Sequence, residues 1–274
     1  MAALERIDSS SSAKQGRFGV LRGLSELALK RGLYELQFLG ETEAGVDLLR
    51  EHLKEGSAVI YTNHFVFDEE AVVTAFLMTN FGDSIRRIGV PVSKKHYDWR
   101  EWYKSWTNLL HAIALRAGPM LGVEETPVVQ HYDTSYEEEV AEDSWKQFLR
   151  SSLEILSQPG GVVFIAPEGR ISQTGSLMEA QAGIGVLAKL CKRKGLPVCF
   201  VPLGILAEGR VGRNFNLFSR KREDHQFGLN MGAPISLESL VGRGMKGREI
   251  ADELMERLAL LLPEERRGVY SFCG

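Results

Sequence analysis

Hydrophobic and polar positions follow two alternating patterns along most of the chain. Short apolar runs are typical of buried strands, and apolar positions three and four residues apart are typical of amphipathic helices. The runs that predict strands are SAVIYT (57–62), IRRIGVPVS (85–93), PVVQHY (127–132), GVVFIA (161–166), PVCFVPLGI (197–205) and FGLNMG (227–232). The stretches that predict helices are 43–56, 68–80, 97–116, 136–157, 176–194 and 248–262. The helix over 176–194 is expected to begin with a capping box of Ser176 and Glu179.

Strands that alternate with helices in this way predict an α/β fold with a largely parallel, mixed central sheet flanked by helices. The chain contains no internal repeat and no evident linker, so we expect a single domain over residues 39–274. Residues 1–16 are small and polar around DSSSSAKQG, which is typical of a flexible tail.

Residues 17–38 form an amphipathic segment that we expect to be helical. Val20, Leu21 and Leu24 share one helical face, while arginine and lysine side chains lie elsewhere. A basic amphipathic helix can lie on an anionic membrane surface. It can equally be half buried on its own domain, as most amphipathic helices are.

Charge and cysteine content exclude several classes of protein. The 274 residues have a formal net charge of −3, so no general basic excess points to nucleic acid as a partner. Three cysteines without a Cys-x-x-Cys pair argue against a disulfide framework and a zinc cluster, and favour buried thiols in a reducing cytosol. No apolar run approaches the ~20 residues that a membrane-spanning helix needs. We therefore expect the protein to remain on the cytosolic side of the membrane.

Familiar nucleotide and hydrolase motifs lack the right context. GRGMKG (242–247) has the spacing of a dinucleotide fingerprint but follows a polar turn, and we interpret it as a loop before the last helix. GIGVLA (183–188) lies within a helical pattern, where glycines allow close packing. The chain contains neither a P-loop motif nor a Gly-x-Ser-x-Gly elbow.

Two segments with candidate chemistry each follow a predicted buried strand. In NHFVFDEE, the imidazole of His64 precedes Asp68 and Glu69 by four and five residues. A base paired with a carboxylate is the arrangement that general-base catalysis uses. The segment PEGRIS contains Glu168, Gly169, Arg170 and Ser172. A guanidinium, backbone N–H groups and a hydroxyl can bind a phosphate monoester. Ligands collect at the carboxyl ends of parallel strands, so we expect the two segments to form one site.

These motifs resemble those of the glycerolipid acyltransferases, which include lysophosphatidate and glycerol-3-phosphate acyltransferases. The family block Asn-His-x-x-x-x-Asp is matched by Asn63, His64 and the acidic cluster. A later block, Pro-Glu-Gly-Thr-Arg-Ser, is matched by Pro167, Glu168, Gly169 and Ser172, with Arg170 one place early. An apolar block with a proline is matched around Pro202, so the resemblance spans roughly residues 39–205.

The resemblance implies a glycerol-3-phosphate acyltransferase-like fold and an acyltransferase activity. A fatty acyl group would pass from acyl-CoA or acyl-carrier protein to the hydroxyl of a phosphorylated glycerol or a lysophospholipid, with 1-acylglycerol-3-phosphate favoured. His64 would be the general base, and Asn63 and the segment Glu168, Gly169, Arg170 and Ser172 would bind the acceptor. No metal or prosthetic group is implied. The enzyme would act in the cytoplasm, peripheral on the cytosolic face of a membrane.

Two departures from the family pattern leave alternatives open. The family spacing places its aspartate at position 69, which is Glu69, and Asp68 is one residue early. If His64 belongs to the helix, Asp68 shares its face; if His64 precedes the first turn, the longer glutamate can reach. We favour Asp68. The family's second block supplies an arginine, whereas the aligned position here is Gln130, and Arg116 is the candidate substitute.

Two other functions compete with acyl transfer. A thioester hydrolase would use the same base with water in place of the acceptor. A lipid-binding protein with a disabled site would retain the fold, and the shifted acid and Gln130 motivate this alternative.

Overall fold

The structure is a computed structural model that describes residues 23, 35–40, 42–65, 69–94, 123–130, 133–207, 226–242 and 244–271. Its strands are β1 (Glu35–Leu39), β2 (Ser57–Thr62), β3 (Arg87–Ser93), β4 (Val123–Val128), β5 (Gly161–Ile165), β6 (Val198–Leu206), β7 (Gln226–Met231) and β8 (Ile235–Ser236). Its α-helices are α2 (Thr42–His52), α3 (Glu69–Phe81), α6 (Glu138–Leu156), α7 (Gly183–Arg193), α8 (Leu237–Leu240) and α9 (Gly247–Ala259). Two 3₁₀ turns follow, η3 (Glu264–Arg266) and η4 (Gly268–Tyr270).

The described strands form one sheet in the order β1-β7-β6-β2-β5-β3-β4, with β8 paired to β6. The five adjacent strands β6, β2, β5, β3 and β4 run parallel to one another. β7 is antiparallel to β6, and β1 runs parallel to β7. The predicted α/β class with a largely parallel, mixed sheet is therefore confirmed.

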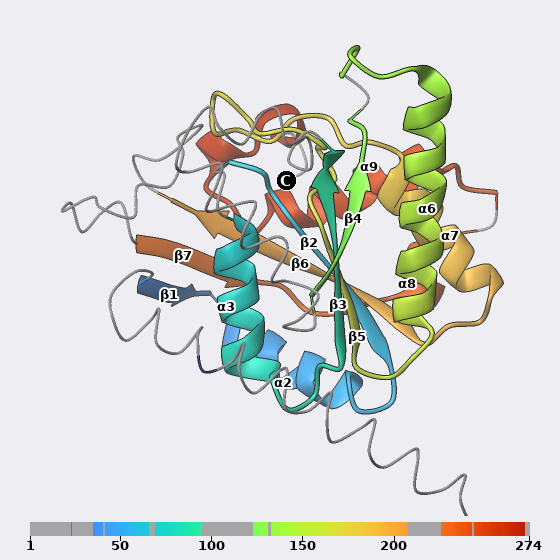
Figure 1. The fold of residues 1–274 in the computed structure, drawn as a ribbon. Helices are drawn as coiled ribbons and strands as arrows, with labels where there is room; N and C mark the ends of the chain where they lie inside the picture. Colours follow the sequence, from blue (N-terminus) through green and yellow to red (C-terminus); the bar gives the residue numbers. More distant parts are fainter. Residues whose placement is uncertain are drawn as a thin grey trace, which may run out of the picture.

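Helices cover both faces of this sheet (Figure 1). The side chains of β2 alternate between two buried clusters, because successive residues of a strand point to opposite faces. Ala58 and Ile60 pack with α2 and α3, whereas Val59 and Tyr61 pack with α6, α7 and α9. Both faces of β2 are buried, which explains why its sequence is an unbroken apolar run.

The glycines of GIGVLA lie where α7 meets its neighbours. A Cβ atom on Gly185 would lie 1.9 Å from the main-chain oxygen of Gly247, at the start of α9. A Cβ atom on Gly183 would lie 2.3 Å from the ring of Trp145 on α6. These glycines therefore permit close packing, as the sequence indicated.

Two strands differ from the prediction. Residues 35–38, expected within a helical segment, form β1 and pair with β7. β4 begins at Val123 and ends at Val128, whereas we predicted a strand over 127–132. The sequence of β4, VEETPV, is polar because β4 is an edge strand and pairs only with β3 among the described strands.

The predicted helix over 176–194 begins seven residues late, at Gly183. The residues before it, 176–182, form an irregular loop. The main-chain N–H groups of Leu177, Met178, Ala180 and Gln181 bond to groups outside the loop, so these residues do not form helical hydrogen bonds.

The other predicted elements that fall on described residues agree with the structure within a few residues, whereas β8, α8 and the two 3₁₀ turns were not predicted. The predicted helix over 97–116 lies outside the described residues. Among those described, no helix is long and apolar enough to cross a bilayer.

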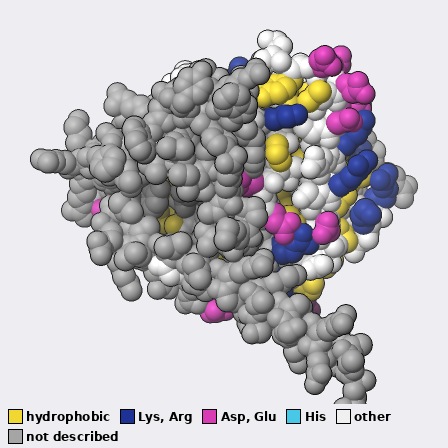
Figure 2. All heavy atoms as spheres, in the orientation of Figure 1, with side chains coloured by type: hydrophobic (Ala, Val, Ile, Leu, Met, Phe, Trp, Pro, Cys, Tyr) yellow, Lys and Arg dark blue, Asp and Glu magenta, His cyan; other side chains and the backbone are white. Residues whose placement is uncertain are grey.

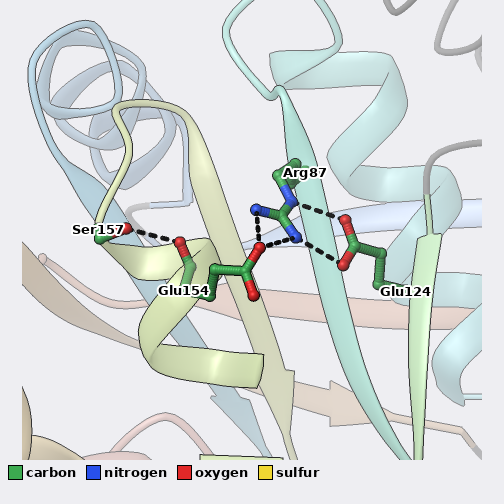
Figure 3. Close-up of polar contacts among 4 residues, drawn as sticks. All are labelled: Arg87, Glu124, Glu154 and Ser157. Atoms are coloured by element: carbon green, nitrogen blue, oxygen red, sulfur yellow. Dashed lines mark hydrogen bonds and ion pairs between the residues drawn. The ribbon is translucent and has the colours of Figure 1, made fainter. Parts of the chain in front are cut away.

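An arginine connects the edge of the sheet to α6 (Figure 3). Arg87 of β3 donates from Nε and Nη2 to the two carboxylate oxygens of Glu124 on β4, at 2.6 and 2.7 Å. It also donates from Nη1 and Nη2 to Glu154 on α6, both at 3.2 Å. Paired bonds to one carboxylate are stronger than single surface contacts. In Figure 2, acidic side chains gather over the upper end of α6, and a group of basic side chains lies below them toward α7.

We expect Arg87→Gln to lower the free energy of unfolding by about 1–2 kcal/mol, because it removes a half-buried bidentate ion pair. Arg257→Gln is the control, since Arg257 forms an exposed helical pair with Glu253 and its loss should cost about 0.5 kcal/mol or less. Urea unfolding followed by circular dichroism measures both. Equal losses in the two variants would contradict a special role for Arg87.

Candidate active site

Two chain segments meet at the carboxyl edge of the parallel strands. β2 lies between β5 and β6 and is hydrogen-bonded to both. Residues 63–65 leave β2 at the same edge at which residues 166–182 leave β5. The expectation that NHFVFDEE and PEGRIS lie together is therefore confirmed by their direct hydrogen bonds.

The imidazole of His64 is paired with the carboxylate of Glu69. Nδ1 of His64 lies 2.6 Å from Oε2 of Glu69. The Glu69 side chain is only 2% exposed, whereas that of His64 is 26% exposed. The other carboxylate oxygen of Glu69 accepts a hydrogen bond from the Phe65 main-chain N–H. A buried carboxylate thus fixes an imidazole that remains partly open to solvent.

This pairing decides which ring nitrogen can act as a base. A carboxylate accepts hydrogen bonds, so the Nδ1 of a neutral His64 carries the hydrogen and Nε2 carries the lone pair. The same carboxylate stabilises the imidazolium that forms when Nε2 takes a proton. The geometry suits His64 for general-base chemistry.

The acid in contact with His64 in the described chain is Glu69. α3 begins at Glu69, so His64 precedes the first helical turn by five residues. The sequence allowed Glu69 to reach the imidazole if His64 precedes the first helical turn, and His64 does precede it. Asp68, which we favoured, lies outside the described residues.

Asn63 is fully buried and bonds to the neighbouring strand. Its Nδ2 donates to the Ile205 carbonyl at 2.9 Å, and its Oδ1 accepts from the Ile205 N–H at 2.8 Å. Both polar atoms of the side chain are thereby used to fix the end of β2 to β6. The binding of substrate by Asn63 stays a prediction, and in the structure its side chain bonds to the main chain of β6.

Glu168 braces the main chain of His64. Its Oε1 accepts from the His64 N–H and its Oε2 from the Met178 N–H, both at 2.8 Å. The residue is 1% exposed. Burial raises the pKa of Glu168 to about 7; the two N–H donors and His64 oppose the rise, and Glu69 adds to it.

Ser172 holds His64 from the other side. Its N–H donates to the His64 carbonyl at 2.7 Å. Its hydroxyl is buried and donates to the Ser176 carbonyl at 2.8 Å. Both side chains are thus buried and bond to the main chain, and the binding of a phosphate by Glu168 and Ser172 stays a prediction.

Gly169 and Arg170 lie at the surface of the same loop. Gly169 has φ = 69°, a conformation that favours glycine, and a Cβ atom there would lie 3.4 Å from Oε1 of Gln130. Gln130 thus borders the loop, a contact for which the sequence gave no signal beyond the family alignment. Arg170 is exposed. Arg116 lies outside the described residues.

No protein-family model matches the chain, and no curated protein matches it. Among solved structures, the crystal structure of the 1-acyl-sn-glycerophosphate (LPA) acyltransferase, PlsC, from Thermotoga maritima is similar. The match has a TM-score of 0.48 and 12% sequence identity, and it covers 88% of this chain and 77% of that chain. At this identity the likeness concerns only the overall course of the chain.

We expect the stability contributed by Glu168 to fall as pH rises from about 5 to 8. The folded protein releases this proton near pH 7, whereas the unfolded chain releases it near pH 4.5, so the folded state binds more protons between these values. The free energy of unfolding should therefore decline across this window by on the order of 3 kcal/mol relative to Glu168→Gln, which cannot titrate.

Urea unfolding of both proteins at several pH values measures this difference. Glu264→Gln, which changes an exposed glutamate, is the control and should follow the wild-type curve. Parallel curves for the wild type and Glu168→Gln would show that Glu168 does not titrate in this range.

Proposed function

We propose that this protein is an acyltransferase of the glycerolipid kind, with His64 as its general base and Glu69 as the carboxylate that orients it. The observation that supports this most directly is the 2.6 Å contact between His64 Nδ1 and the buried Glu69 carboxylate at the carboxyl edge of the sheet. Ligands of parallel α/β folds collect at that edge.

In the proposed reaction, Nε2 of His64 removes the proton of an acceptor hydroxyl as its oxygen attacks the carbonyl carbon of an acyl thioester. The new C–O bond forms, the C–S bond breaks, and the thiol leaves with a proton returned by the imidazolium. General-base assistance is worth ~10²–10⁴-fold in rate. Glu69 keeps the imidazole in the required tautomer and offsets its charge during the step.

The proposed acyl donor is acyl-CoA or acyl-carrier protein, and the proposed acceptor is a phosphorylated glycerol or lysophospholipid. The exposed guanidinium of Arg170, next to the turn at Gly169, supports an anionic acceptor. Such substrates would place the enzyme at the cytosolic face of an anionic membrane.

We expect His64→Ala to abolish acyl transfer while the protein stays folded, because the variant lacks the base. The measurement is thiol release from acyl-CoA with and without candidate acceptors such as glycerol 3-phosphate and 1-acylglycerol 3-phosphate. Circular dichroism and the unfolding midpoint are the control for folding.

Three other results would contradict the proposal. Transfer retained by a folded His64→Ala variant would exclude His64 as the base. Thiol release that is independent of acceptor would indicate a hydrolase. The absence of release with every donor and acceptor would indicate a binding protein.

Glu69→Gln should lower kcat about 10²-fold or more, because an amide cannot offset the charge of the imidazolium. Asp68→Asn is the matched comparison and should change kcat less than about threefold if Glu69 alone orients the imidazole. Steady-state kinetics with a saturating acceptor separates the two. A larger loss in Asp68→Asn would transfer the role to Asp68.

A further inference from the structure

The C-terminal turns pack against the irregular loop that precedes α7. The Leu177 N–H donates to the Arg266 carbonyl at 2.9 Å, and the Val269 N–H donates to the Leu177 carbonyl at 3.3 Å. Nearby, the Ser176 hydroxyl donates to the Glu265 carbonyl at 3.2 Å. Bonds thus run in both directions between two segments about 90 residues apart.

Gly268 makes this close approach possible. A Cβ atom at this position would lie 2.0 Å from the Leu177 main-chain oxygen. Its φ of 54° is also a conformation that favours glycine. The turn therefore lies directly on the loop backbone.

Tyr270 completes the contact through its hydroxyl. It accepts from the Ala180 N–H at 3.0 Å and donates to Oδ1 of Asp252 on α9 at 2.9 Å. Burial holds the pKa of Tyr270 above its ordinary value, so the hydroxyl keeps the hydrogen that it donates. The loop is thereby fixed to α9 through one tyrosine.

The loop in turn reaches His64. Met178 lies between the two positions held by the C-terminal turns, Leu177 and Ala180, and its N–H bonds to Glu168. The other oxygen of Glu168 bonds to the His64 N–H. Tyr270 is therefore connected to the main chain of His64 by three hydrogen bonds and the short stretch of loop backbone between Ala180 and Met178.

The loop sequence also has a helical pattern, and a helix at this position would break the connection. Ser176 and Glu179 have the spacing of a capping box, which favours extending α7 toward its N-terminus. In such a helix the N–H groups of Ala180 and the residues after it would bond within the helix, and the loop backbone would turn away from Glu168. In the structure, the N–H groups of Leu177 and Ala180 bond instead to Arg266 and Tyr270 of the C-terminal turns.

We propose that residues 264–270 form a C-terminal latch and that Tyr270 is a positioning residue for His64, acting through Ala180, Met178 and Glu168. This inference rests on the proposed function of His64. The latch places no group on the substrate; it holds the loop whose Met178 N–H fixes one oxygen of the Glu168 carboxylate. Its loss should therefore lower the rate of the chemical step more than the affinity for substrate.

Tyr270→Phe tests the latch by removing only the hydroxyl. We expect kcat to fall roughly tenfold with KM changed less than about twofold, because a small displacement of a catalytic group has a large effect on rate. Tyr61→Phe is the matched control. Tyr61 is also buried, and its hydroxyl has no hydrogen-bond partner in the described chain, so its removal should leave kcat unchanged.

Hydrogen exchange provides a readout that does not depend on activity. In Tyr270→Phe, amide exchange should accelerate about tenfold or more in fragments covering 176–182 and 60–65, and it should not change there in Tyr61→Phe. Faster exchange confined to 176–182, with kcat unaltered, would overturn the latch. A wild-type protein without acyl transfer would instead overturn the proposed function, and the exchange data would still decide whether Tyr270 supports His64.

Discussion

The hydrogen bond from the His64 N–H to the Glu168 carboxylate joins two segments that lie 104 residues apart in the chain. The bond from Ser172 to the His64 carbonyl holds the same residue from the other side. A base accelerates a reaction most when it is held in position, and a fixed main chain leaves only the two side-chain torsions of His64 to be set. Glu168 and Ser172 fix the backbone, and Glu69 fixes the ring. The remainder of the site is built around these contacts.

Two buried carboxylates near one histidine have different tasks. Glu69 faces the ring, and Glu168 faces main-chain N–H groups. Burial disfavours the charged form of a carboxyl group, and a second carboxylate nearby adds to this effect. These two effects raise the pKa of Glu168, whereas the N–H groups of Met178 and His64 lower it. The resulting pKa of Glu168 is about 7. The charge of the Glu168 carboxylate that accepts from the His64 N–H therefore depends on how deeply Glu168 is buried, and the fold as a whole sets this burial.

Element type and order were readable from the sequence because they depend on local periodicity. The apolar run SAVIYT is β2 at the predicted residues, and the helix predicted from residue 68 begins at Glu69. The prediction misplaced the polar edge strand β4 and missed the edge strand β1, because edge strands lack a continuous apolar pattern. The loop 176–182 has a helical sequence but lacks helical structure, because its N–H groups bond to Arg266, Glu168 and Tyr270.

For the candidate site too, some features follow from the sequence and others only from the tertiary structure. The sequence by itself determined that His64, an acidic cluster and the PEGRIS segment follow buried parallel strands, and hence that they share one edge of the sheet. Tertiary structure decided that Glu69 contacts the ring, that Asn63 bonds to β6, and that the Glu168 carboxylate and the Ser172 N–H bond to the backbone of His64. The physical reason is that strand and helix patterns are set by neighbours a few residues away. The partner of a buried polar group is set by whatever donor or acceptor the fold places beside it.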